Sequence, residues 1–125
     1  MDIKFGDVMQ VDFGVTTGSI QGNIRPCVVI QNDAGNKFSP TTIVVPLTSE
    51  IKKVNMPVHD ILYKSARNGL KSNSLILGEQ VRVIDKSMIL YKLGTLNDEE
   101  CDKVIGAYIR NVPRRKNRRM ASYGA

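Results

Sequence analysis

Arg25 and Thr48 are the two side chains whose type and position point most directly to chemistry on an anion. Arg25 precedes Pro26 at the start of one apolar run, and Thr48 comes just after the end of another. A guanidinium presents a planar set of donors that matches a phosphate and stays protonated, and a hydroxyl adds one more donor. Taken singly, each has a plainer interpretation, because arginine is common on surfaces and threonine often caps a strand end. The pair predicts a phosphate-handling site only if the chain brings both together.

The two apolar runs are the elements that would position this pair. Residues 27–30 and 42–45 are rich in β-branched side chains and are bounded by Gly, Asn, Asp or Pro, which is typical of buried strands. We expect them to be antiparallel neighbours joined by a loop over 32–40. The start of one strand then lies beside the end of the other, so Arg25 and Thr48 face each other across one rim of the sheet.

Four further polar residues are candidates for the same region. His59 is the only side chain in the sequence that titrates near neutral pH, and it is either a general acid or base or a half-exposed strand histidine. Glu79 and Gln80 follow Gly78 at a strand entry, where the amide can read a base edge and the carboxylate can accept an amino group or a proton. Arg82 is either a phosphate contact or a salt-bridge partner.

The sequence argues against several other chemistries. It has one histidine and two cysteines without metal-ligand spacing, and it has no phosphate-cradling glycine loop, nucleophile elbow or dinucleotide fingerprint. Cys27 and Cys101 lie in apolar patterns, so we expect two reduced core thiols. We therefore expect a site that uses neither metal nor cofactor.

The remaining pattern predicts a mainly β domain. Residues 7–13 alternate as in a half-buried strand, and the eleven residues 14–24 are expected to form a long loop. Frequent turn signals between short strands are typical of a small barrel-like sheet. The further strands are expected at 56–62, 74–77, 81–84 and 88–93.

One helix is predicted at the C-terminal end of this sheet. Asn97 is a good N-cap, and Glu100 completes a capping-box pattern in an acidic first turn. Pro113 is expected to end the helix. Apolar side chains recur at helical spacing and predict a stripe packed on the sheet, made of Cys101, Val104, Ile105, Tyr108, Ile109 and Val112.

The length of 125 residues suits one domain, over 1–112, followed by a basic tail over 113–125. Five of the 18 Lys and Arg residues lie in the tail, which has no acidic residue, so the body has 13 basic against 12 acidic residues. We expect the tail to be disordered and either to attract phosphates or to be a passive extension. No run suits a membrane span or signal peptide, so a cytoplasmic location is expected.

Five spaced blocks stand out in the sequence: QGNIRP at 21–26, QNDAGN at 31–36, SPT at 39–41, LT at 47–48 and LGEQVRVIDK at 77–86. These blocks resemble the MazF/PemK family of toxin endoribonucleases. Their shared order between residues 6 and 112 is far more specific than a single short match. Asn23, Gly78 and Val83 depart from the family pattern, in which a second glycine, a bulky apolar residue and a threonine are common.

The resemblance implies a small SH3-like β-barrel with a C-terminal helix that cleaves single-stranded RNA without metal. The 2′-hydroxyl of the RNA attacks the adjacent phosphate, with Arg25 stabilising charge and Thr48 donating a hydrogen bond or orienting the hydroxyl, to leave a 2′,3′-cyclic phosphate and a 5′-hydroxyl. A homodimer that binds RNA along the subunit junction, and a cognate antitoxin whose acidic segment fills the same groove, are also implied. The RNA-binding candidates are Thr17, Ser19, Gln21, Asn36, His59, Glu79, Gln80 and Arg82.

Two other functions stay open on the sequence alone. Related toxins of this fold poison DNA gyrase instead of cutting RNA, and a gyrase poison has no need of the Arg25 and Thr48 pair. A barrel used only as a protein-interaction module predicts no nuclease activity. The relative placement of these two side chains therefore discriminates between the functions.

Overall fold

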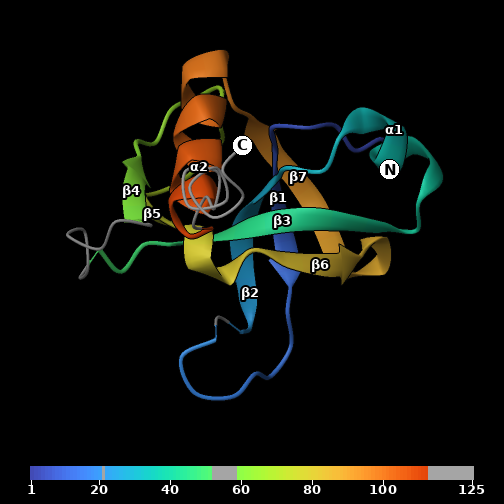
Figure 1. Cartoon of the computed structure of the whole chain (residues 1–125), viewed down its shortest axis with the longest axis horizontal. Helices are drawn as coiled ribbons and strands as arrows, with labels where there is room; N and C mark the ends of the chain where they lie inside the picture. The colour runs from blue at the N-terminus through green and yellow to red at the C-terminus, as the bar shows by residue number, and fades with distance from the viewer. Residues whose placement is uncertain (21, 52–58, 113–125) are drawn as a thin grey trace, which may run out of the picture.

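The chain folds into a curled antiparallel sheet with one long helix packed across it (Figure 1). The computed structural model describes residues 1–20, 22–51 and 59–112, and of His59 the backbone alone. Among these residues the strands follow the order β4-β5-β3-β2-β1-β7, and β6 also pairs with β3. The predicted mainly β fold is confirmed, although no strand pairing in the described part of the sheet closes it into a complete barrel. The strands are β1 (Asp7–Asp12), β2 (Ile24–Val29), β3 (Thr41–Thr48), β4 (His59–Leu62), β5 (Ser74–Leu77), β6 (Arg82–Asp85) and β7 (Ile89–Thr95).

β2 and β3 are the strand pair predicted from the two apolar runs. They are antiparallel, and Cys27 of β2 lies opposite Pro46 of β3. Continuing this register by two residues sets Arg25 opposite Thr48. The two candidate side chains therefore stand at the same rim of the sheet, as the sequence predicted.

A short helix, α1 (Asp33–Phe38), occupies the connection that the sequence predicted as a loop. The Asn32 side chain caps it by accepting a hydrogen bond from the Gly35 N–H at 2.8 Å. The Asp33 carboxylate accepts a hydrogen bond from the Phe5 N–H at 2.7 Å, and this bond lowers the pKa of the Asp33 carboxyl below its ordinary value. The prediction of a loop was wrong because α1 is held by a contact with a distant segment, which no local pattern contains.

Two clusters of buried side chains occupy the two faces of the sheet. One lies between the sheet and helix α2 (Asp98–Arg110), and the other is formed by side chains from β1, β2, β3, β6 and β7. β1 contributes Val8 to the first cluster and Met9 to the second, so this strand is buried on both faces and not half-buried as expected. Cys27 lies in the second cluster, where burial raises the pKa of its thiol, as expected for a core cysteine.

α2 begins as predicted, but its buried face is turned from the predicted stripe. The Asn97 side chain accepts from the Glu100 N–H at 2.8 Å, and the Glu100 carboxylate accepts from the Asn97 N–H at 3.0 Å. Ala107 is fully buried, whereas Ile109 is 48% exposed. Gly78 packs so closely on α2 that a Cβ at this position would lie 2.6 Å from the Ala107 carbonyl. This contact between small residues sets the orientation of the helix, which is why the predicted stripe was wrong at its end.

Two short 3₁₀ helices complete the described elements. η1 (Gly78–Gln80) connects β5 to β6, and η2 (Lys86–Met88) connects β6 to β7. η1 packs against α2, and it carries two of the candidate RNA-binding residues toward the rim of the sheet. Among the helices in the described ranges, none has the length and apolar character that crossing a membrane requires.

Candidate functional site

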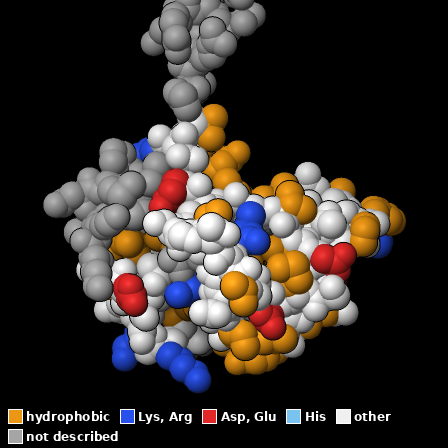
Figure 2. Space-filling view, turned by 90° about the horizontal axis from the view of Figure 1, so that it is seen from below, with side chains coloured by type: hydrophobic (Ala, Val, Ile, Leu, Met, Phe, Trp, Pro, Cys, Tyr) orange, Lys and Arg blue, Asp and Glu red, His pale blue; other side chains and the backbone are white. Residues whose placement is uncertain are grey.

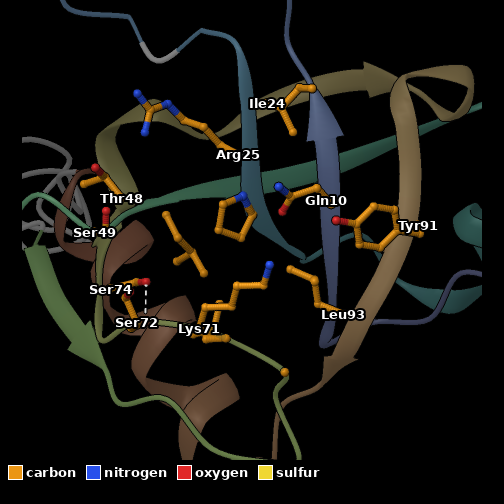
Figure 3. A pocket seen from close by; sticks show the side chains of 14 residues that line it. Gln10, Ile24, Arg25, Thr48, Ser49, Lys71, Ser72, Ser74, Tyr91 and Leu93 are labelled. Atoms are coloured by element: carbon orange, nitrogen blue, oxygen red, sulfur yellow. Dashed lines mark hydrogen bonds between the residues drawn. The ribbon is translucent and has the colours of Figure 1, made fainter.

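The strand ends that carry Arg25 and Thr48 border one pocket, which is shown in Figure 3. The pocket has a volume of about 240 Å³ and is lined by residues of β1, β2, β3, β7 and the segment 69–74. Apolar side chains form much of its lining, and polar side chains surround them. The apolar part is made of Ile24, Pro26, Leu47, Leu70 and Leu93.

Arg25 is half-buried at one end of this pocket. Its Nε–H donates a hydrogen bond to the Gly22 carbonyl at 2.9 Å. This bond fixes the position of the guanidinium, and the two terminal nitrogens are the donors that can reach a phosphate. An arginine held in this way loses less side-chain freedom when it binds an anion.

Thr48 is the last residue of β3 and is only 6% exposed. Its Oγ1 accepts a hydrogen bond from the Glu50 N–H at 3.2 Å, which is the strand-end cap that sequence analysis gave as the plainer interpretation. Accepting this bond uses a lone pair of the oxygen and not its proton. The hydroxyl can therefore cap the strand and donate to a phosphate oxygen at the same time.

Arg25 and Thr48 share one face of the sheet as well as one rim. Arg25 lies opposite Val11, whose side chain belongs to the core cluster that also contains Cys27. Directly opposite residues share a face, and side chains two residues apart along a strand point the same way. Thr48 is two residues from Pro46, which lies opposite Cys27, so Thr48 shares this face. In Figure 3 both side chains lie at the same end of the pocket. Both side chains therefore border the same end of one pocket.

The β1–β2 loop lies beside Arg25 and carries three of the predicted RNA-binding residues. Thr17 and Ser19 are exposed, and Gln21 lies outside the described residues. The Gln80 side chain donates to the Ser19 carbonyl at 3.2 Å, which joins η1 to this loop. Arg25 also lines a second, more polar hollow formed by the loop. The structure therefore brings Ser19, Gln80 and Arg25 into one region.

Three other candidates lie in η1, at the start of β4 and at the start of β6. Glu79 precedes Gln80 in η1 and is half-buried. The backbone of His59 pairs with Leu77 at the start of β4, and its side chain lies outside the described residues. The Arg82 guanidinium lies 4.6 Å from the centre of the Phe13 ring, in a cation–π contact. The sequence had suggested either a phosphate contact or a salt bridge for Arg82, and this contact is a third arrangement.

Asn36 is the predicted RNA-binding residue that the structure places apart from the pocket. It is buried in α1, which precedes the start of β3, whereas Thr48 stands at the end of that strand. Its side chain accepts a hydrogen bond from Thr42 Oγ1 at 2.7 Å and donates one to the Gln31 carbonyl at 2.9 Å. Asn36 thus ties α1 to the sheet.

The pocket also contains polar residues that sequence analysis did not select. Gln10, Lys71 and Tyr91 all line it, on the side away from Arg25 (Figure 3). Gln10 could have been found, because it is a polar residue between buried Met9 and Val11. Lys71 lies between the expected strands 56–62 and 74–77, where the sequence predicted no element.

The charge on the described body is mixed. Figure 2 shows basic and acidic side chains interspersed over the described part of one face, in keeping with the nearly balanced charge of residues 1–112. In the ranges that the structure describes, no group of three or more His, Cys, Asp or Glu side chains is placed to hold a metal ion. Binding of a polyanion here would depend on specific donors more than on a broad basic field.

Solved structures of similar shape define the class of fold. A crystal structure of MazF from Deinococcus radiodurans has a TM-score of 0.73 at 21% identity, covering 86% of this chain and 94% of that one. An endoribonuclease in complex with its cognate antitoxin from Mycobacterial species has a TM-score of 0.71 at 18% identity, covering 90% and 98%. The fold is therefore that of the MazF-type toxins.

Sequence comparison then identifies the family. The family described as PemK-like, MazF-like toxin of type II toxin-antitoxin system matches residues 4–111. The chain is 46% identical over 104 residues to endoribonuclease EndoA of Bacillus subtilis (strain 168), covering 83% of this chain and 89% of that protein. It is 45% identical over 105 residues to endoribonuclease MazF of Staphylococcus saprophyticus, covering 84% and 87%. The chain belongs to the PemK-like, MazF-like toxin family.

Proposed function

We propose that this toxin is an endoribonuclease that cuts single-stranded RNA, without a metal ion, at the rim formed by Arg25 and Thr48. The observation that carries the proposal is the convergence of these two side chains on one end of one pocket. Neither a gyrase poison nor a protein-interaction module needs a guanidinium and a hydroxyl in this relation. The identity to proteins named endoribonucleases supports the same activity.

The reaction uses a nucleophile that the RNA itself carries. The 2′-hydroxyl oxygen attacks the adjacent phosphorus and loses its proton, the bond from phosphorus to the 5′-oxygen breaks, and the 5′-oxygen gains a proton. The products end in a 2′,3′-cyclic phosphate and a 5′-hydroxyl. The protein must align the attacking oxygen with the leaving oxygen and stabilise the charge that develops on the phosphorane.

Arg25 and Thr48 divide this work. The terminal N–H groups of Arg25 donate to the non-bridging phosphate oxygens, where negative charge grows, because the Gly22 carbonyl already holds the Nε–H. The Thr48 hydroxyl donates to the phosphate or orients the 2′-hydroxyl, and its bond from the Glu50 N–H fixes the oxygen. Both groups are positioned before substrate binds, which is what makes such donors effective.

The residues around the β1–β2 loop hold the rest of the RNA. Thr17, Ser19 and Gln21 offer hydrogen-bonding groups on the loop, and Gln80 joins the loop to η1 through the Ser19 carbonyl. The remaining predicted contacts with the RNA are His59, Glu79 and Arg82, whereas Asn36 is buried and ties α1 to the sheet. An alanine scan of these positions with RNA binding as the readout tests each contact.

We propose two protein partners as well. One is a second copy of this chain, with RNA bound along the junction, and light scattering of the purified protein tests it by mass. The other is a cognate antitoxin with an acidic segment, and structures of similar fold include a complex with MazE. An antitoxin that occupies the pocket must compete with RNA for Arg25.

We assign the basic residues 113–125 an auxiliary role outside the toxin domain of 1–112. Five Lys and Arg residues without an acidic one favour contact with RNA phosphates. Deletion after Val112 then weakens the salt dependence of RNA binding and leaves the cleavage sites unchanged. An unchanged salt dependence would make the segment a passive extension.

The product ends test the activity directly. Purified protein is incubated with a long unstructured RNA in EDTA, and the new ends are analysed. We expect 5′ ends that accept phosphate from a polynucleotide kinase without prior phosphatase treatment, and 3′ ends that are cyclic. Full-length RNA after incubation, or cleavage only after addition of a divalent metal, would contradict the proposal.

A further inference from the structure

One wall of the pocket is formed by the segment that connects β4 to β5. Residues 69–72 of this segment line the pocket, and in Figure 3 Lys71 lies across the pocket from Arg25. Arg25 and Thr48 stand on β2 and β3, which are paired with each other. The proposed cleavage step uses that side of the pocket, which leaves the role of the wall at 69–72 open.

Asn68 is the side chain around which this wall is built, and it is fully buried. Its Oδ1 accepts hydrogen bonds from the Ser65 and Leu70 N–H groups, both at 3.0 Å. Its Nδ2 donates to the Tyr63 carbonyl and to Glu100 Oε2, both at 2.9 Å. The two donor and two acceptor positions of the amide are therefore all in use.

The bond to Glu100 differs in kind from the other three. A turn asparagine ordinarily bonds to backbone groups close to it in the sequence, whereas Glu100 lies 32 residues away in the first turn of α2. The second carboxylate oxygen of Glu100 accepts from the Asn97 N–H at 3.0 Å. One carboxylate therefore caps α2 and anchors the pocket wall, through a bond that its charge strengthens.

The backbone of the same segment is fixed separately, against β7. The Arg67 carbonyl accepts a hydrogen bond from the Thr95 N–H at 3.0 Å. Gly94 lies so close to the Asn68 backbone that a Cβ there would clash with it. The segment is thus held to β7 by its backbone and to α2 by the Asn68 side chain, so a change of that side chain releases the second contact alone.

We propose that Asn68 is a positioning residue for RNA binding, which acts by holding the wall at 69–72 to α2 through Glu100. The wall then faces Arg25 at a fixed separation, and RNA contacts both sides of the pocket at once without first ordering one of them. The inference rests on the proposed cleavage at Arg25 and Thr48. Because β2 and β3 carry those two residues, releasing the wall weakens RNA binding and leaves the chemical step intact.

The test separates KM from the rate at saturating RNA, on one oligonucleotide in EDTA with the full chain. Asn68→Asp replaces the donor to Glu100 by a second carboxylate, and Glu100→Gln leaves one acceptor oxygen for two bonds. We expect each variant to raise KM by roughly 10- to 100-fold and to keep a saturating rate close to that of wild type. Thermal melting shows which variants fold, and Glu100→Gln alone carries the test if Asn68→Asp does not.

The double variant Asn68→Asp with Glu100→Gln provides a rescue, because it reverses the direction of the bond. The amide at position 100 then donates to the carboxylate at position 68, and its oxygen still accepts from the Asn97 N–H. We expect KM to return part of the way to the wild-type value, since the bond to the Tyr63 carbonyl stays lost.

Asn97→Ala is the matched control for lost stability. It removes the bond from the Glu100 N–H to the Asn97 side chain and leaves the bond between Asn68 and Glu100 in place. We expect this control to have the KM of wild type.

The outcomes distinguish this role from the proposed function. An Arg25-dependent enzyme whose KM is unchanged in the folded single variants overturns the positioning role and leaves the nuclease proposal intact. The same holds if KM rises equally in Asn97→Ala, or if the two single effects simply multiply in the double variant. A wild-type protein that does not cut RNA at all overturns both.

Discussion

Substitution of Thr48 separates its two roles, because a capping role and a catalytic role predict different results for the same pair of variants. Thr48→Val keeps the shape of a side chain that is only 6% exposed and removes the hydroxyl. Thr48→Ser keeps the hydroxyl and removes a methyl group. The first change removes a donor, and the second removes only packing.

The structure sets the size of each effect. Thr48→Val loses the hydrogen bond from the Glu50 N–H, which costs about 1 kcal/mol of unfolding free energy, and Thr48→Ser loses about the same from its methyl group. The two variants should therefore have similar melting temperatures. Loss of one pre-organised donor should slow cleavage by roughly 10² to 10³ in Thr48→Val alone.

Single-turnover cleavage of one oligonucleotide in EDTA measures this difference, with thermal melting on the same samples. We expect Thr48→Ser to cut at a rate close to that of wild type and Thr48→Val to be nearly inactive although folded. Equal activity in the two variants, whether high or low, would refute a hydrogen-bonding role of Thr48 in the reaction.

Three further predictions concern the elements that position the site. Gly69 has φ +71° and lies against the Leu93 carbonyl. Gly69→Ala should therefore lower the unfolding free energy by at least about 3 kcal/mol in urea denaturation, and a smaller loss would contradict the close contact. Asn97→Ala should cost about 1 kcal/mol in the same assay, and no loss would mean that the capping box adds nothing. Burial raises the pKa of Cys27, so above about pH 9 the thiol ionises in the unfolded chain only. Wild type should therefore lose stability relative to Cys27→Val above that pH, by up to about 1.4 kcal/mol per pH unit. Parallel pH curves for the two proteins would contradict that assignment.

Features carried by local pattern were predictable from the sequence. The capping box at Asn97 and Glu100 depends on residues three positions apart, and the structure has it as predicted. The β2–β3 pair follows from two β-branched runs, and its register, continued by two residues beyond Cys27, sets Arg25 opposite Thr48. Resemblance and local pattern together therefore located the end of the pocket at which we propose that RNA is cleaved.

The opposite end of the pocket was not predictable for a physical reason. The β1–β7 pairing contains two register shifts, so Ile89 lies opposite Val11 while Tyr91 lies opposite Gln10. Simple alternation would put Ile89 and Tyr91 on the same face, whereas the irregularity sends Ile89 into the core and Tyr91 to the pocket. A sequence pattern gives no sign of where a strand shifts its register.

Cleavage by Arg25 variants tests the central claim most directly. The rate on one oligonucleotide in EDTA is measured for wild type, Arg25→Lys, Arg25→Ala and, as a control, Arg110→Ala, an exposed arginine at the end of α2. The account predicts that Arg25→Ala loses roughly 10² to 10³ in rate, that Arg25→Lys recovers part of it through its charge, and that the control matches wild type. Full cleavage by folded Arg25→Ala would contradict the account.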